Sequence, residues 1–141
     1  MARTTFKAEV LTPEGLLFDE QVEMVSTKTT IGSIGLLAGH EPLLARLEPT
    51  ELRLYRSESD IVRYAQAEGY VQMSAAGALV LVEEAVPVER LDAAALQEQA
   101  AAARRALEVA EPGSEEQTRA AHDLRRAEVF LAIAGGGGSQ R

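Results

Sequence analysis

The chain has no cysteine, no tryptophan and only two histidines among its 141 residues. It therefore cannot hold a disulfide or a thiolate-bound metal, and His40 and His122 are too far apart in sequence to indicate a histidine-based metal site. Basic residues are also scarce, with 14 lysines and arginines against 22 acidic residues and a net charge of −8. A nucleic-acid partner needs a basic surface, so this class is excluded, and the composition indicates no cofactor.

Long hydrophobic runs are missing as well. No apolar stretch approaches the ~20 residues that cross a bilayer, and residues 1–7 lack the apolar segment of a signal peptide. We expect no direct bilayer insertion, so that any membrane association goes through a partner protein. A hydrophobic content of 46% is still enough for one domain with a core and a smaller appendage.

One segment places glycines and prolines around a single histidine: residues 32–49 read GSIGLLAGHEPLLARLEP. Its glycines permit a positive φ or a close backbone approach, whereas its prolines fix φ. The apolar runs 34–37 and 43–47 are therefore predicted to be short strands between sharp turns.

Residues 6–86 are predicted to form a β-sandwich, because short apolar runs alternate with turn signals every 8 to 12 residues. The alternating runs 51–56 and 61–65 indicate an antiparallel hairpin closed by a turn at 57–60. The run 78–82 is continuously apolar, which predicts a strand buried on both faces near the centre of the fold.

After Pro87 the composition changes to strong helix formers. Asp92 is the expected N-cap of a helix over residues 93–110, and Leu91 and Leu96 are placed to form a hydrophobic staple at its start.

A second helix is predicted from a capping box of Ser114 and Gln117 to the glycines at 135–138. The sequence thus predicts a β-sandwich at residues 1–86, followed by an α-helical hairpin at 87–141 that ends in a flexible glycine-rich tail.

Small apolar residues at heptad-like spacing predict the seam between the two helices. They are Leu96, Ala100, Ala103, Leu107 and Ala110 on the first helix, and Ala120, Leu124, Ala127, Leu131 and Ala134 on the second. Because alanine buries little area, such a seam contributes only a few kcal/mol at about 25 cal/mol per Å². We also expect Glu115, Arg119 and Asp123 to form an exposed ladder of ion pairs, and the hairpin to open easily.

The glycine–proline segment resembles the signature G-x-x-G-I-L-P-G-H-x-P-L-L-T-x-L-x-P-G of the epsilon subunit of F-type ATP synthases. Ala38 stands for the usual proline, Ala45 for threonine and Thr50 for the closing glycine. Residues 67–72 and 79–85 are similar to two further strand segments of the family, which also has an N-terminal β-sandwich and two C-terminal helices.

The resemblance implies a non-catalytic subunit in the central stalk of a bacterial ATP synthase, peripheral to the cytoplasmic face of the plasma membrane. Its implied partners are the gamma subunit, the membrane rotor ring of c subunits and, through the C-terminal helices, the catalytic alpha/beta head. The loop signature implies ring contacts at Gly32, Ser33, Gly39, His40 and Glu41.

The C-terminal helices of the family restrain ATP hydrolysis through basic residues that meet acidic residues of the catalytic subunits. This implies inhibitory contacts at Arg104, Arg105, Arg119, Arg125 and Arg126, whose guanidinium groups suit carboxylate partners.

Some bacterial members bind ATP through an Ile/Leu-Asp-x-x-Arg-Ala motif. Here Asp92 is kept as a candidate nucleotide contact, but Ala95 replaces the arginine and Leu96 the alanine, so at most weak ATP binding is expected.

Three other readings stay open. An ATP-sensing module would bind nucleotide as an isolated chain, and an unrelated β-sandwich interaction domain would use its helices to oligomerise. An enzyme is disfavoured, because no nucleophile, base and orienting group come together around His40, and His122 lies among charged residues as a solvated side chain would.

Overall fold

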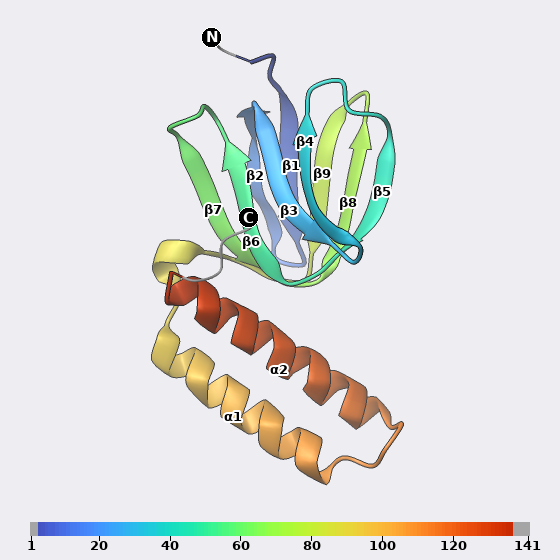
Figure 1. The fold of residues 1–141 in the computed structure, drawn as a ribbon, viewed down its shortest axis with the longest axis vertical. Coiled ribbons are helices and arrows are strands. Elements are labelled where there is room, and N and C mark those ends of the chain that lie inside the picture. Colours follow the sequence, from blue (N-terminus) through green and yellow to red (C-terminus); the bar gives the residue numbers. More distant parts are fainter. Residues whose placement is uncertain (1–2, 137–141) are drawn as a thin grey trace. The chain divides into compact units, whose positions relative to one another are not determined.

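The computed structural model describes residues 3–136, so most of the predicted glycine-rich tail lies outside the described residues (Figure 1). The chain divides into two compact units at the Pro87–Val88 peptide. The first unit contains β1 (Phe6–Thr12), β2 (Gly15–Val22), β3 (Met24–Thr29), β4 (Gly32–Leu37), β5 (Leu43–Leu47), β6 (Thr50–Tyr55), β7 (Ile61–Gln66), β8 (Gly69–Ser74), β9 (Gly77–Val82) and β10 (Ala85–Pro87). The second contains the 3-10 turn η1 (Val88–Arg90) and the helices α1 (Ala93–Val109) and α2 (Glu115–Ala134).

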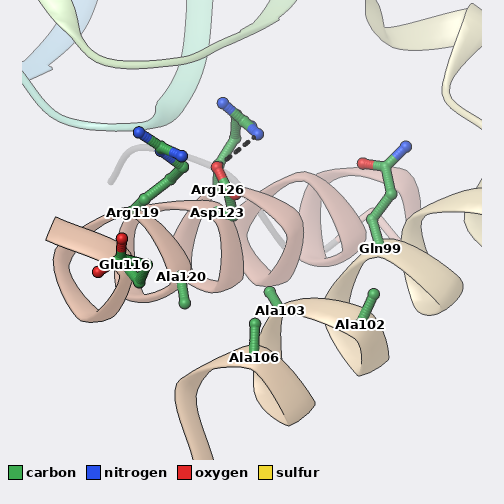
Figure 2. Close-up of a pocket in the computed structure, with 9 residues that line it drawn as sticks. All are labelled: Gln99, Ala102, Ala103, Ala106, Glu116, Arg119, Ala120, Asp123 and Arg126. Atoms are coloured by element: carbon green, nitrogen blue, oxygen red, sulfur yellow. Dashed lines mark hydrogen bonds and ion pairs between the residues drawn. The ribbon is translucent and has the colours of Figure 1, made fainter. Parts of the chain in front are cut away.

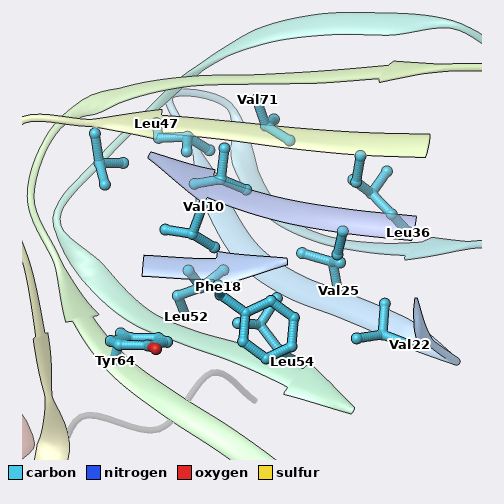
Figure 3. Packing of buried hydrophobic residues seen from close by; sticks show 14 of the residues in the cluster. Val10, Phe18, Val22, Val25, Leu36, Leu47, Leu52, Leu54, Tyr64 and Val71 are labelled. Atoms are coloured by element: carbon cyan, nitrogen blue, oxygen red, sulfur yellow. The ribbon is translucent and has the colours of Figure 1, made fainter. Parts of the chain in front are cut away.

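The β domain is a sandwich of two layers. One layer has the order β5-β8-β9-β1-β2, the other has the order β10-β7-β6-β3 with β4 paired to β3, and the pair Thr29–Leu47 joins them. The inward side chains of both layers form one hydrophobic cluster, in which residues such as Val10, Val25 and Leu52 are fully buried (Figure 3). A β-sandwich followed by two helices is the predicted fold class, which is confirmed.

The strands predicted around the glycine–proline segment are confirmed as β4 and β5. The predicted hairpin is confirmed as β6 and β7, which pair antiparallel, and the amide of Ser57 donates to the carbonyl oxygen of Asp60 (3.3 Å) in the turn between them.

The prediction that residues 78–82 are buried on both faces is wrong. Burial alternates along β9, with Val80 fully buried and Leu81 44% exposed. β9 does lie between two other strands, β8 and β1, but only one face of this layer meets the core of the β domain. The apolar run is continuous because β9 carries hydrophobic side chains on its outer face as well as on the face that meets the core.

A polar side chain is fully buried in the β domain. The side chain of Gln66 is fully buried, its oxygen accepts from the hydroxyl of Thr27 (2.6 Å), and its Nε2 donates to the carbonyl oxygens of Glu48 (3.0 Å) and Ala67 (2.9 Å). Gln66 thereby ties β3 to the turns before β6 and after β7.

Both predicted helix starts are confirmed. The carboxylate of Asp92 accepts from the amide of Ala95 (3.2 Å), and the hydroxyl of Ser114 accepts from the amide of Gln117 (3.1 Å). The capping box differs in one respect: the Gln117 side chain accepts from the amide of Gly113 (2.7 Å), because the Ser114 amide already donates to the carbonyl oxygen of Glu111.

The predicted seam of the hairpin holds in its middle and fails at the end of α2. Leu96, Ala103 and Ala127 are buried, but Ala134 is exposed. Phe130 and Ile133 are buried instead, at 2% and 3% exposure. The reason is that α2 packs against η1 as well as against α1, which gives it a wider buried face than a heptad stripe predicts.

The predicted ladder of ion pairs on α2 is also wrong. Within the described residues, Asp123 pairs with Arg126, three positions on (3.1 Å), and not with Arg119. Spacings of three and four both bring side chains together on a helix, so the sequence alone did not decide between the two arginines.

Candidate functional site

The turn between β3 and β4 presents a single apolar side chain. The hydroxyl of Thr29 accepts from the amide of Ile31 (3.2 Å) and donates to the carbonyl oxygen of Gly32 (2.9 Å), so the side chain of Thr29 holds the tip. Gly32 has φ +138°, which a residue with a side chain adopts with strain. Ile31 is 97% exposed at this tip, beside the predicted contact residues Gly32 and Ser33.

The loop at the other end of β4 holds the remaining predicted ring contacts. Gly39 has φ +80°, and the amide of His40 donates to the carbonyl oxygen of Leu37 (3.1 Å). The Nδ1 of His40 lies 2.8 Å from the carbonyl oxygen of Glu41, the distance of a hydrogen bond in which the ring nitrogen donates. His40 is exposed, and this bond gives it a structural role in the loop.

The structure does not bring the five predicted ring contacts together. Gly32 and Ser33 begin β4, whereas Gly39, His40 and Glu41 follow its end. An extended strand rises about 3.3 Å per residue, so the length of β4 separates the two groups by roughly 16 Å. They form two surfaces, one at each end of the sandwich.

Sequence analysis missed an exposed apolar surface on the outer face of the layer β5-β8-β9-β1-β2. Strand pairing sets Tyr70 beside Leu81, Leu81 beside Leu11, and Leu11 beside Leu16. Tyr70, Leu81 and Leu16 are 48%, 44% and 51% exposed. We call these four residues the apolar row, and its signal in the sequence was the apolar residues between the core positions of β9.

Charged side chains lie near the apolar row. Arg46 of β5 pairs with Tyr70 at one end, and Lys7 and Asp19 form an ion pair (3.3 Å) across β1 and β2. An apolar strip with a charged border is the usual composition of a protein–protein interface.

The predicted inhibitory arginines are spread over both helices. Arg104 on α1 lies 3.5 Å from the carboxylate of Glu128 on α2, and Arg126 is held by Asp123. Arg105, Arg119 and Arg125 are exposed. The five residues do not form one cluster.

A groove of about 490 Å³ runs between α1 and α2 (Figure 2). Alanines line it from both helices, and Arg119, Asp123 and Arg126 stand along its border on α2. Asp92, the candidate nucleotide contact, does not line this groove and is engaged as the cap of α1.

Within residues 3–136, no three histidine or carboxylate side chains gather to hold a metal ion. None of the helices in this part of the chain is both long and apolar enough to cross a membrane.

The fold and these surfaces define a β-sandwich protein with an appended helical hairpin. Residues 5–88 match the family model of the beta-sandwich domain of the ATP synthase delta/epsilon chain. The chain is 33% identical to ATP synthase epsilon chain 2 of Syntrophotalea carbinolica, over 94% of this chain and 95% of that protein. It is also 33% identical to the ATP synthase epsilon chain of Persephonella marina, over 92% of this chain and 96% of that protein.

The fold recurs in a solved structure. A chain in the cryo-EM structure of the Euglena gracilis mitochondrial ATP synthase, OSCP/F1/c-ring, superimposes with a TM-score of 0.74 at 23% identity, over 88% of this chain and 78% of that one. With the sequence matches, this protein belongs to the ATP synthase epsilon chain family.

Proposed function

We propose that this chain is a non-catalytic rotor subunit of a bacterial ATP synthase, peripheral to the cytoplasmic face of the membrane. Its β domain would join the gamma subunit to the ring of c subunits, and its helices would restrain ATP hydrolysis by the alpha/beta head. Family membership and the names of its relatives support this role. It requires binding surfaces and no bond-making chemistry.

The observation that carries the proposal is the apolar row. The outer face of a sandwich layer in a protein that works alone is expected to be polar. Here the four residues of the apolar row lie side by side on four paired strands, β8, β9, β1 and β2. We assign this face to the gamma subunit, since a shaft that turns with the β domain needs a fixed, largely apolar contact.

The two ends of β4 then serve different partners. The loop with Gly39, His40 and Glu41 leads into β5, where Leu44 is 71% exposed on the same outer face as the apolar row. We therefore assign this loop to the border of the gamma contact, and Gly32 and Ser33, with Ile31 at the tip, to the ring.

The cysteine-free sequence allows this assignment to be tested by cross-linking. Single cysteines introduced as Ser33→Cys and His40→Cys should cross-link, in the assembled complex, to a c subunit and to gamma respectively. Cross-links from both positions to the same subunit would contradict the assignment.

The gamma contact is tested by Leu81→Lys and Leu16→Lys. Because both side chains are about half exposed, the β domain should still fold, while a lysine placed in an apolar contact should weaken binding to isolated gamma at least tenfold. Val109→Lys is the matched control, an 83% exposed apolar residue on α1. Unchanged affinity for both variants, with normal melting, would refute the assigned face.

The restraint on hydrolysis is tested by removing residues 91–141. Assembly should persist and ATP hydrolysis by the reconstituted complex should rise. Replacing Arg119, Arg125 and Arg126 by alanine should reproduce part of that rise, since alanine keeps helix propensity and removes the charge. If neither change raises hydrolysis in normally assembled complexes, the subunit only couples the stalk to the ring.

Weak ATP binding at most is proposed for the hairpin. Ala95 offers no cation, and the carboxylate of Asp92 already accepts the hydrogen bond that caps α1. This argues against the ATP-sensing module as the main function.

A further inference from the structure

The ion pair between Arg104 and Glu128 joins the two helices of the hairpin. Arg104 Nη2 lies 3.5 Å from Glu128 Oε2, and the two side chains are 54% and 56% exposed. Arg104 follows the buried Ala103 on α1, and Glu128 follows the buried Ala127 on α2. The pair therefore lies at one border of the alanine seam, with one member on each helix.

Arg104 is also one of the arginines for which the family resemblance implies contacts to acidic residues of the catalytic subunits, the restraint on which our proposed function rests. The contact with Glu128 turns the guanidinium group of Arg104 toward α2, and the negative charge of Glu128 weakens the attraction of this cation for a second carboxylate. Glu128 and a carboxylate of the partner therefore compete for the same cation.

We propose that Arg104 and Glu128 form a latch of the folded hairpin, and that a carboxylate of the catalytic head takes the place of Glu128 when the hairpin opens. The exchange rests on the proposed function, whereas the latch itself is a property of the isolated chain. An exposed ion pair shifts an equilibrium by only about two- to fivefold, so this latch biases the hairpin without locking it.

The latch predicts opposite effects for its two members in the complex. Glu128→Gln keeps the size of the side chain and removes its charge, which frees Arg104 for the partner and should strengthen inhibition of hydrolysis. Arg104→Gln loosens the hairpin equally but removes the cation, so inhibition should weaken. If the two side chains had only a structural role, both substitutions would change the inhibition of hydrolysis in the same direction.

The isolated full-length chain provides a test that does not depend on the ATP synthase. Spin labels on Gln97→Cys and Ala132→Cys, both at exposed positions of α1 and α2, report the distance between the helices. Glu128→Gln should raise the open fraction about two- to fivefold, and the exchanged pair Arg104→Glu with Glu128→Arg should restore the original fraction. Glu108→Gln is the matched control, an exposed carboxylate on α1 that should leave the distances unchanged.

The outcomes separate the latch from the proposed function. An unchanged open fraction in Glu128→Gln, or no recovery in the exchanged pair, overturns the latch. Opening in the isolated chain together with opposite effects of the two variants on hydrolysis supports the whole proposal. Opening with no effect of either variant on hydrolysis supports the latch, and contradicts both the exchange and the inhibitory contact of Arg104.

Discussion

Replacing Gln66 by leucine should cost the β domain about 3 kcal/mol of unfolding free energy. The substitution places an apolar side chain in the buried site and removes the three hydrogen bonds that Gln66 makes to Thr27, Glu48 and Ala67. At about 0.5–1.5 kcal/mol of net stabilisation per bond, the loss is about 1.5–4.5 kcal/mol. The hydroxyl and carbonyl groups that lose Gln66 as their partner favour a loss of about 3 kcal/mol or more over a smaller one. Each kcal/mol lowers the melting temperature of a domain of this size by about 4–8 °C.

The partner substitution makes this prediction specific. Thr27→Val removes one hydrogen bond and leaves the buried oxygen of Gln66 without this donor, so it should cost about 1–3 kcal/mol. The double variant should lose less unfolding free energy than the two single variants lose together. In the double variant, the hydroxyl that Gln66→Leu leaves without its acceptor is absent.

Unfolding in denaturant, followed by circular dichroism, measures all four species. Gln72→Leu is the control, since Gln72 is exposed on β8 and its replacement should change stability by less than about 0.5 kcal/mol. If Gln66→Leu is no more destabilising than this control, the buried network does not hold the core together and the reasoning fails.

Three further predictions concern the domains, the nucleotide and a close packing contact. A chain ending at Arg90 should keep a cooperative thermal transition and a sheet-type circular dichroism spectrum, because the hydrophobic cluster lies entirely within the β domain; loss of the transition would refute this. Titration calorimetry should show ATP binding weaker than low micromolar, and Ala95→Arg should strengthen it; tight binding by the natural chain would contradict the argument from Ala95. Gly69→Ala should lower the unfolding free energy of the β domain by more than about 2 kcal/mol, because the added methyl group would overlap the carbonyl oxygen of Leu81. Gly35→Ala is the control, since its methyl group would lie 3.5 Å from Met24 Sδ and should be tolerated. Thermal melting of both variants compares the two effects.

The strands and helix caps could be predicted from the sequence because their signals are local. Asp92 and Ser114 accept the expected amide hydrogen bonds, and β6 and β7 pair across the expected turn. Each of these features depends on neighbours within a few residues, so the order of residue types is sufficient to specify it.

The surfaces could not be predicted in the same way, because they depend on which distant segments meet. Leu16 and Tyr70 belong to one apolar row only through the pairing of β8, β9, β1 and β2. In the same way, the family resemblance groups residues 32–41 as one contact segment, whereas β4, predicted as a strand at 34–37, separates its two ends. The partner of Arg104 likewise lies 24 positions away on another helix.

The buried face of α2 changes what the hairpin needs in order to open. An alanine seam alone would separate readily, but Phe130 and Ile133 are nearly fully buried, and exposing side chains of this size costs about 1.5–3 kcal/mol each. The latch between Arg104 and Glu128 is worth less than either of them. A partner that stabilises the open hairpin therefore has to cover apolar surface as well as supply carboxylates, so an acidic segment alone would not hold the helices apart.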